Sequence, residues 1–332
     1  MTDSDQTAWT QPDWLEQSHK WIHQELAKRS IKAVGPIKQH HIRPWSIVLL
    51  VPTDRGNIYF KATAEVQGFE PAVSQAISRW QPELIPEVLA IDAEQRWMLM
   101  VDGGQRLREA FRAGLAVDSW SQILAKYALL QQTLSTHVDE MFSFGVRDRR
   151  LPVLPGLYAV LLADYELLLI DRNGGITSSE YQRLLDSRPR VAEMCRQLAG
   201  FNIPASLHHN DLHDANIFVD EDRYLFYDWG DSSVSHPFFS LRTVFVSIEN
   251  TFGFQEGHPI FEDLASDYLD AWRDYESKED LLRAFEISRR LWSISSAVKY
   301  QTLLVHMESI RNDFADAVPG LLQEFLELNP DF

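Results

Sequence analysis

The sequence predicts an α+β fold of two lobes, a small β-rich N-terminal lobe and a larger, mainly helical C-terminal lobe. Short apolar runs bounded by turn residues precede Gly103, as expected of strands. Apolar residues at spacings of three and four follow Leu107, as expected of helices. We therefore expect an N-terminal lobe over residues 1–102, disordered over 1–11, and a C-terminal lobe over residues 103–332.

The N-terminal lobe alternates between the two periodicities. An amphipathic helix is expected over Pro12–Ser30. The apolar runs Trp45–Val51 and Ile58–Ala62 are joined by turn residues, which predicts a β-hairpin. A second amphipathic helix is expected over Phe69–Trp80, and the apolar run Trp97–Val101 predicts another strand.

The C-terminal lobe is expected to be helical. A long helix capped by Asp118 places one apolar face at Trp120, Ile123, Leu124, Tyr127, Leu130, Leu134 and Val138. Pro152, Pro155 and Gly156 interrupt the pattern. Further helices are expected near Ala159–Leu169, over Ser178–Leu198 and around Ile287–Val298.

Two polar segments carry most of the functional information. The first reads His209-Asn210-Asp211-Leu212-His213-Asp214-Ala215-Asn216, and the second reads Asp228-Trp229-Gly230-Asp231. Between them, the runs Ile217–Val219 and Tyr224–Tyr227 are rich in β-branched and aromatic residues, and Asp220–Asp222 is typical of a turn. Such a hairpin would fold the chain back and bring Asp228 beside Asn216.

This spacing parallels the catalytic loop and the metal-binding D-F-G sequence of protein kinases. By that parallel, Asp211 can accept the proton of a substrate hydroxyl, while Asn216 and Asp228 can hold a magnesium ion on the phosphates of ATP. An amide oxygen and a carboxylate suit Mg²⁺, which takes hard oxygen ligands and keeps several waters. The alternative is a polar loop whose Asp and Asn side chains cap helices, but the intervening hairpin favours the catalytic interpretation.

The stretch from His208 to Asp231 resembles the catalytic core of the aminoglycoside phosphotransferase and choline kinase-like family. Members of that family have a protein-kinase-like fold and mostly phosphorylate small molecules. The resemblance extends more loosely from about Trp45 to about Tyr300. It implies that Asp211 is the catalytic residue and that Asn216 and Asp228 are the metal ligands.

The resemblance also bears on three flanking residues. It implies that His209 supports the catalytic loop, whereas the role of His213 stays open. Further along, the family often has an aspartate before a helix, and Ser240 stands at that position. Any interaction that this acid makes in the family is therefore in doubt here.

The same resemblance implies a nucleotide site in the N-terminal lobe. Lys61, late in the second hairpin strand, would pair with the α- and β-phosphates. Its expected partner is Glu70, in the first turn of the next helix, with Glu65 as the alternative. The strand that stops at Asp102-Gly103-Gly104 fits a hinge beside the adenine, so Met100 and Asp102 are candidate nucleotide contacts. The segment 37–45 contains no glycine, so a G-x-G-x-x-G phosphate loop is absent.

The composition limits the environment and the partners. The net charge is −17, from 31 basic and 48 acidic side chains, which disfavours nucleic acids and anionic membranes. The same charge would attract a cationic substrate, although it also serves simple solubility. The polar, acidic start lacks the features of a secretory signal, and no apolar run reaches the roughly 20 residues that span a bilayer. The single cysteine, Cys195, is compatible with a reducing compartment, so we expect a cytoplasmic location. Separately, we expect a monomer or a homodimer.

Three hypotheses follow. The first is a small-molecule kinase that uses ATP (or GTP) and Mg²⁺ and phosphorylates a hydroxyl of an amino sugar, an aminoglycoside or an amino alcohol. The second is a catalytically silent nucleotide-binding protein of the same fold, and the third is a protein kinase. No A-P-E sequence follows Asp228-Trp229-Gly230, which argues against the third. Four acidic residues are expected either to line an acceptor pocket or to form a solvated helix face, namely Glu249, Glu262, Asp263 and Asp267.

Overall fold

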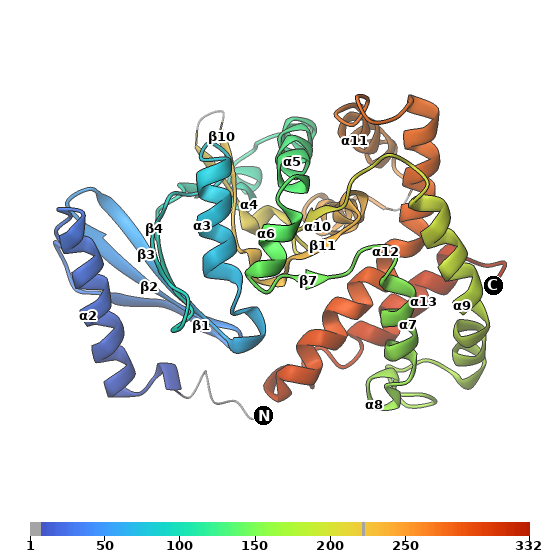
Figure 1. Ribbon diagram of the computed structural model, residues 1–332, viewed down its shortest axis with the longest axis horizontal. Coiled ribbons are helices and arrows are strands. Elements are labelled where there is room, and N and C mark those ends of the chain that lie inside the picture. The colour runs from blue at the N-terminus through green and yellow to red at the C-terminus, as the bar shows by residue number, and fades with distance from the viewer. Residues whose placement is uncertain (1–7, 221–222, 256) are drawn as a thin grey trace. The chain divides into compact units, whose positions relative to one another are not determined.

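The computed structural model describes residues 8–220, 223–255 and 257–332, and the chain divides into two compact units. The first unit runs to Ala110 and takes in residues 215–230 and 306–310. The second consists of residues 111–214, 231–305 and 311–332. Strands form most of the first unit and helices most of the second, so the predicted α+β class is confirmed (Figure 1).

The first unit is built on a five-stranded antiparallel sheet. Its strands are β1 (Lys38–Arg43), β2 (Ser46–Thr53), β3 (Gly56–Thr63), β4 (Val88–Asp92) and β5 (Trp97–Val101). They lie in the order β1-β2-β3-β5-β4. The predicted hairpin is β2–β3, in which Val48 pairs with Lys61. Strands β2 and β3 follow each other in the chain and are joined by a turn. Strand β5 also pairs with β3, although a longer stretch of chain separates the two.

Two helices lie on opposite faces of this sheet, α2 (Pro12–Lys28) and α3 (Glu70–Trp80) (Figure 1). Trp21 of α2 contacts Phe60 and Trp97, with ring centroids 5.9 and 5.7 Å apart. Such an aromatic cluster anchors α2 mainly by burial of apolar area. Because successive side chains of a strand point to opposite faces, Lys61 points away from the α2 side that Phe60 occupies.

A second, three-stranded sheet completes the first unit. It consists of β10 (Arg223–Phe226), β9 (Ile217–Asp220) and β6 (Gln105–Arg106), in that order. The β9–β10 hairpin is the one predicted from the sequence, but most of its expected turn, residues 221–222, lies outside the described residues. Because β6 pairs with β9, the first unit continues past the expected boundary at residue 102, into α4 (Leu107–Arg112).

The second unit is formed mainly by helices. They are α5 (Ser119–Ser135), α6 (Val138–Ser143), α7 (Leu154–Leu162), α8 (Tyr165–Leu168), α9 (Ser178–Leu198), α10 (Ser240–Phe252), α11 (Pro259–Asp270), α12 (Lys278–His306) and α13 (Ala317–Leu328). The last residue of α12, His306, belongs to the first unit. Three short strands also lie in the second unit, with β11 (Ser233–Ser235) between β7 (Arg147–Asp148) and β8 (Ser206–His208).

The structure corrects three helix predictions. The chain breaks after α5, so Val138 starts α6 instead of extending the apolar face of the long helix. Pro155 and Gly156 do not interrupt a helix, because they lie in the first turn of α7, where proline loses no helical hydrogen bond. The expected helix near Ala159–Leu169 is instead the end of α7 followed by α8, which stops at Leu169 with a φ of 50°.

Two further expectations concern the N-terminal stretch, residues 1–11, and membrane-spanning helices. Of the stretch 1–11 that we expected to be disordered, residues 1–7 lie outside the described residues. Trp9 is buried, with 3% of its surface exposed. Among the residues that the structure describes, no helix is both long enough and apolar enough to cross a membrane.

Candidate active site

Lys61 is the centre of the candidate nucleotide site in the first unit. Its Nζ lies 2.6 Å from Oε1 of Glu70 and 2.6 Å from Oδ1 of Asp228. Lys61 is 5% exposed and Glu70 is fully buried at 0%, so their ion pair is shielded from water. Three segments that are distant in the sequence, β3, the start of α3 and the turn after β10, thus meet at one ammonium group.

The charges around Lys61 keep it protonated. Burial alone would lower the pKa of Lys61, but the carboxylates of Asp228 and Glu70 outweigh it and raise the pKa. Glu70 reaches Lys61 because α3 begins at this residue, with Pro71 in its first turn. The structure thus brings Lys61 together with Glu70 and not with Glu65, the alternative partner, which starts a short 3-10 helix.

A pocket of about 260 Å³ opens beside this ion pair within the first unit. Met100 and Asp102, the two candidate nucleotide contacts, both line it, together with Lys61 and Asp228. Its aromatic side is formed by Phe218 and Tyr227, whose rings stack 4.1 Å apart at 11°. The remaining lining residues are His40, His41, Trp45, Ser46, Val48, Tyr59, Val101, Gly104, Arg106 and Glu109. The pocket therefore combines a fixed lysine, held by two carboxylates, with a flat aromatic wall, a combination that suits a nucleotide once a metal ion is bound.

Gly103 is required at the edge of this pocket. A Cβ atom placed on Gly103 would lie 2.1 Å from Cδ2 of Phe218, so any other residue here would force Phe218 to move. Gly104 follows with a φ of +96°, and its amide donates to Oδ1 of Asp102 at 3.0 Å. The paired glycines that predicted the end of strand β5 thus let Phe218 approach the backbone closely.

The two proposed metal ligands are both in the first unit. The amide of Tyr227 donates to the carbonyl of Asn216 at 3.2 Å, which closes the hairpin next to Asp228. Asn216 is 6% exposed, and the side chain of Asp228 is 36% exposed. Asp228 has a φ of 68°, an unusual backbone conformation for a residue other than glycine. An amide oxygen and a carboxylate provide the type of ligand that Mg²⁺ accepts, so the residues present fit that ion.

Asp211, the candidate catalytic residue, lies in a loop of the second unit that two histidines hold. Its backbone amide donates to Nδ1 of the buried His209 at 3.3 Å. Its Oδ2 lies 3.3 Å from Nε2 of His213. His209 is in turn held by its own amide, which donates to the hydroxyl of Tyr127 at 3.3 Å. His209 therefore contacts the loop backbone, and His213, whose role the sequence left open, contacts the carboxylate itself.

Lys299 of α12 is a further residue at this loop that the sequence did not indicate. Its Nζ lies 3.3 Å from the carbonyl oxygen of Asn210 and 3.5 Å from Oδ2 of Asp231. It is 6% exposed, and Asn210 has a φ of 64°. The available signal for this residue was a lysine within a buried helical segment rich in small residues. That signal does not identify the partners of Lys299, because they lie far away in the sequence.

The surroundings hold Asp211 in its charged form. Burial opposes ionisation, but the hydrogen bond from His213 and the positive charge of Lys299 together lower the pKa of Asp211 below its ordinary value of 3.8. A carboxylate whose pKa is lowered is a weaker base. We therefore expect it to orient a hydroxyl and accept its proton late in a reaction.

Ser240 stands where the family often has an acid. Its side chain instead takes part in an uncharged hydrogen-bond network. Its Oγ lies 3.2 Å from the hydroxyl of Tyr127 and accepts from Nε2 of Gln131 at 3.2 Å. Oε1 of Gln131 accepts from the hydroxyl of Tyr268 at 2.5 Å. Since Tyr127 also accepts the amide of His209, this buried network connects the start of α10 to the catalytic loop without a charge.

The acidic residues considered for an acceptor pocket divide into two pairs. Glu249 and Glu262 line a second pocket, of about 550 Å³, within the second unit. Asp263 and Asp267 are both exposed and are not part of the lining that the described residues form.

Comparison with known proteins gives the class of this chain, a phosphotransferase that acts on small molecules. The chain belongs to the phosphotransferase enzyme family, whose model matches residues 83–281. Members transfer a phosphoryl group to an alcohol acceptor. The expected resemblance to the aminoglycoside phosphotransferase and choline kinase-like family is thereby confirmed.

Solved structures share the kinase-like fold at low sequence identity. An ethanolamine kinase from Plasmodium vivax has a TM-score of 0.60 at 12% identity, over 96% of this chain and 89% of that chain. A choline/ethanolamine kinase family protein from Mesorhizobium loti has a TM-score of 0.59 at 15% identity, over 89% and 88%. A putative aminoglycoside phosphotransferase from Ralstonia eutropha has a TM-score of 0.54 at 12% identity, over 92% and 97%. Comparison with curated protein sequences gives no match.

Proposed function

We propose that the protein is a magnesium-dependent kinase that transfers the γ-phosphoryl group of ATP, or of GTP, to a hydroxyl of a small molecule. The observation that supports this most strongly is the buried Lys61, held 2.6 Å from both Glu70 and Asp228 at the edge of a pocket of about 260 Å³. Phosphoryl transfer depends mainly on positioning and electrostatics, and a fixed cation beside a metal-binding carboxylate supplies both.

We assign the nucleotide-binding roles within the first unit. Lys61 contacts the α- and β-phosphates, and Glu70 fixes its side chain. Met100 and Asp102 lie at the base end of the pocket, where their strand meets the glycine pair. Asn216 and Asp228 would hold Mg²⁺, which would supply positive charge beside the phosphates.

We assign the acceptor chemistry to the loop of the second unit. Asp211 orients the acceptor hydroxyl and takes its proton, His213 keeps the carboxylate ionised, and His209 holds the backbone of the loop. The low pKa of Asp211 suits a loose transition state, in which the hydroxyl needs little activation before the phosphoryl group leaves ATP.

We propose a cationic acceptor, in the class of amino sugars, aminoglycosides or amino alcohols. The net charge of −17 favours such a molecule, and the neighbouring folds include an ethanolamine kinase and a putative aminoglycoside phosphotransferase. An enzyme that consumes ATP in this way would work in the cytoplasm, as a monomer or a homodimer.

The test is nucleotide consumption measured with Mg²⁺ across aminoglycosides, amino sugars, sugars and amino alcohols, with ATP and GTP in parallel. Asp211→Ala should abolish turnover and retain nucleotide binding, whereas Asp228→Ala should abolish magnesium-dependent binding. Asp186→Ala, an exposed carboxylate on α9, is the matched control and should retain full turnover. Turnover that survives both site variants would refute the proposal. Tight binding of magnesium nucleotide without turnover on any acceptor would indicate a silent nucleotide-binding protein.

A further inference from the structure

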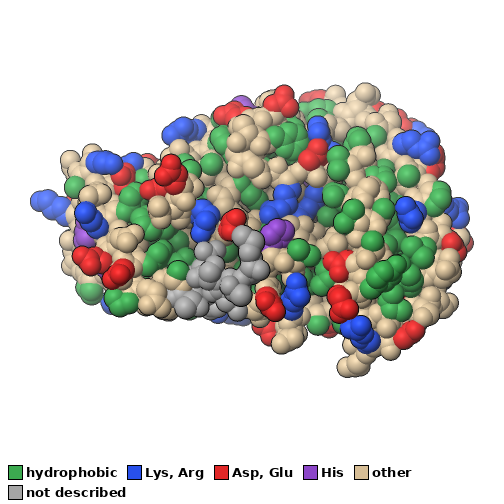
Figure 2. Space-filling view, turned by 60° about the horizontal axis from the view of Figure 1, so that its bottom comes forward, with side chains coloured by type: hydrophobic (Ala, Val, Ile, Leu, Met, Phe, Trp, Pro, Cys, Tyr) green, Lys and Arg blue, Asp and Glu red, His purple; other side chains and the backbone are tan. Residues whose placement is uncertain are grey.

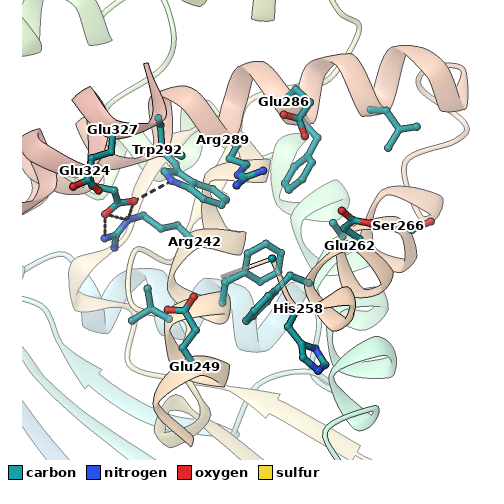
Figure 3. A pocket seen from close by; sticks show the side chains of 18 residues that line it. Arg242, Glu249, His258, Glu262, Ser266, Glu286, Arg289, Trp292, Glu324 and Glu327 are labelled. Carbon is teal, nitrogen blue, oxygen red and sulfur yellow. Dashed lines mark hydrogen bonds and ion pairs between the residues drawn. The ribbon is translucent and has the colours of Figure 1, made fainter. Parts of the chain in front are cut away.

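The second unit contains a pocket with a large aromatic wall. This four-helix pocket, about 550 Å³ in volume, lies among α10, α11, α12 and α13 (Figure 3). Phe245 packs against Phe261 and Trp292, with ring centroids 5.1 and 6.0 Å apart, and Phe285 lies 6.4 Å from Trp292. The volume is that of a site for a drug-sized molecule, and its apolar wall comes from three of the helices.

The charges around the four-helix pocket are mostly negative. Five glutamates and two arginines line it, which gives a formal balance of −3 from these seven side chains. Arg242 and Glu324 form an ion pair with a 2.9 Å contact from Nε to Oε1, and Nε1 of Trp292 donates to the same Oε1 at 3.2 Å. In Figure 3, Glu249, Glu262 and Glu286 lie around the aromatic side chains, each on a different helix. An aromatic wall surrounded by carboxylates attracts a cation through both charge and ring electrons.

Helix α10 separates this pocket from the catalytic loop. Ser247 accepts the backbone amide of Asp214 at 3.2 Å, and Thr251 donates to Oδ2 of Asp214 at 2.8 Å. Phe245 and Glu249, which line the pocket, each precede one of these residues by two positions, about 200° around a helix. The pocket and the catalytic loop therefore contact opposite sides of α10, and no residue of 209–214 is among the described residues that line the pocket.

We propose that the four-helix pocket is a second ligand site, separate from the acceptor position at Asp211, and that it binds an organic cation with an aromatic or apolar body. The cation would lie near Glu262 and Glu286, and its apolar body would pack on Phe245, Phe285 and Trp292. Two helices connect the pocket to the catalytic loop: α10, through its contacts to Asp214, and α12, which carries both Trp292 and Lys299.

The test is isothermal titration of the full-length chain at low ionic strength with benzylammonium, phenethylammonium and tryptamine. Indole-3-propionate, which has the ring of tryptamine but an anionic group, is the matched probe. The cations should bind and the anion should not. The double variant Glu262→Gln/Glu286→Gln should weaken cation binding by about tenfold, since each lost carboxylate contributes a fraction of that factor.

The control variant makes the same charge change on the same two helices. Asp263→Asn/Glu279→Gln alters exposed residues of α11 and α12 outside the pocket lining and should change the affinity by less than about twofold. Asp211→Asn should leave cation binding unchanged. The proposal is overturned if none of the cations binds, if the anion binds equally, if both double variants lose affinity alike, or if Asp211→Asn abolishes binding, because the last result would place the cation at the catalytic loop.

Discussion

At the scale of the residue, the Lys61–Glu70 pair makes the sharpest prediction. Glu70→Gln keeps the shape of the side chain but removes one of the two carboxylates that contact Lys61 at 2.6 Å. We expect kcat/KM for ATP to fall by roughly tenfold to a hundredfold, which corresponds to the loss of one charge-assisted hydrogen bond. Lys61 should remain protonated, because Asp228 still raises its pKa. Steady-state kinetics with varied magnesium ATP would measure the effect.

Glu65→Gln is the control for that change, since the sequence alone could not choose between the two glutamates. It should leave kcat/KM within about twofold of the wild-type value, because the 2.6 Å contact of Lys61 goes to Glu70. An equal loss in both variants would show that charge near the sheet, and not the contact with Lys61, sets the affinity for ATP.

Lys299 makes a second prediction, in which the pH dependence is informative. Lys299→Met removes the cation that contacts the carbonyl of Asn210 and lowers the pKa of Asp211. The pKa of Asp211 should therefore rise, and the acid side of the pH profile of kcat should move to higher pH. We also expect kcat to fall by about tenfold with KM for ATP little changed, because the catalytic loop loses an anchor.

Lys299→Arg retains the charge and should restore the position of the acid limb, which separates a positioning role from simple packing. Thermal unfolding of both variants is the necessary companion measurement, since a buried lysine contributes to stability as well. A pH profile that is identical in Lys299→Met and the wild type would contradict the assignment.

At the scale of the element, the β9–β10 hairpin depends on Gly103. Gly103→Ala would place a methyl group 2.1 Å from Phe218, whose ring also stacks on Tyr227 in the nucleotide pocket. Overpacking of this kind costs about 1–3 kcal/mol of unfolding free energy, and we expect weaker ATP binding because Phe218 must move. Urea denaturation would measure the loss, and adding Phe218→Ala should recover part of it.

Gly156→Ala is the control, because it adds the same methyl group at a position where no neighbouring atom is close. Gly156 lies in the first turn of α7, and no atom lies within 4 Å of a Cβ built there. Gly156→Ala should therefore be neutral or slightly stabilising, since alanine favours a helix. A loss as large as that of Gly103→Ala would show that contact with Phe218 is not the cause.

The elements show what local sequence patterns can and cannot predict. Helix α9 and the two hairpins were predictable because periodicity, capping and turn residues act over short distances. Strands β8 and β11 were not, because three residues are too few to show an alternation. The candidate site follows the same rule. Asp211, Asn216 and Asp228 share one motif, whereas Lys299 contributes through a contact that spans 89 residues of sequence.

At the scale of the whole molecule, the net charge of −17 is not gathered into one visible patch. On the face shown in Figure 2, acidic and basic side chains are interspersed. Charge excess of this kind lowers affinity for anionic polymers and membranes in general. Selection of a cation must then come from pockets, where aromatic walls and nearby carboxylates act at short range.

Binding of magnesium ATP should stabilise the whole chain in a way that separates binding from turnover. A ligand that binds only the folded state adds about 2.7 kcal/mol to the unfolding free energy at a concentration 100 times its Kd. We expect that gain in the wild type and in Asp211→Ala, because Asp211 is assigned to the acceptor and not to the nucleotide. Asp228→Ala, or wild type with EDTA, should lose it. Thermal denaturation with and without nucleotide gives the measurement, and hydrogen exchange should show the added protection in β3, α3 and the β9–β10 hairpin. Equal stabilisation of wild type and Asp228→Ala would mean that ATP binds without the metal site proposed here.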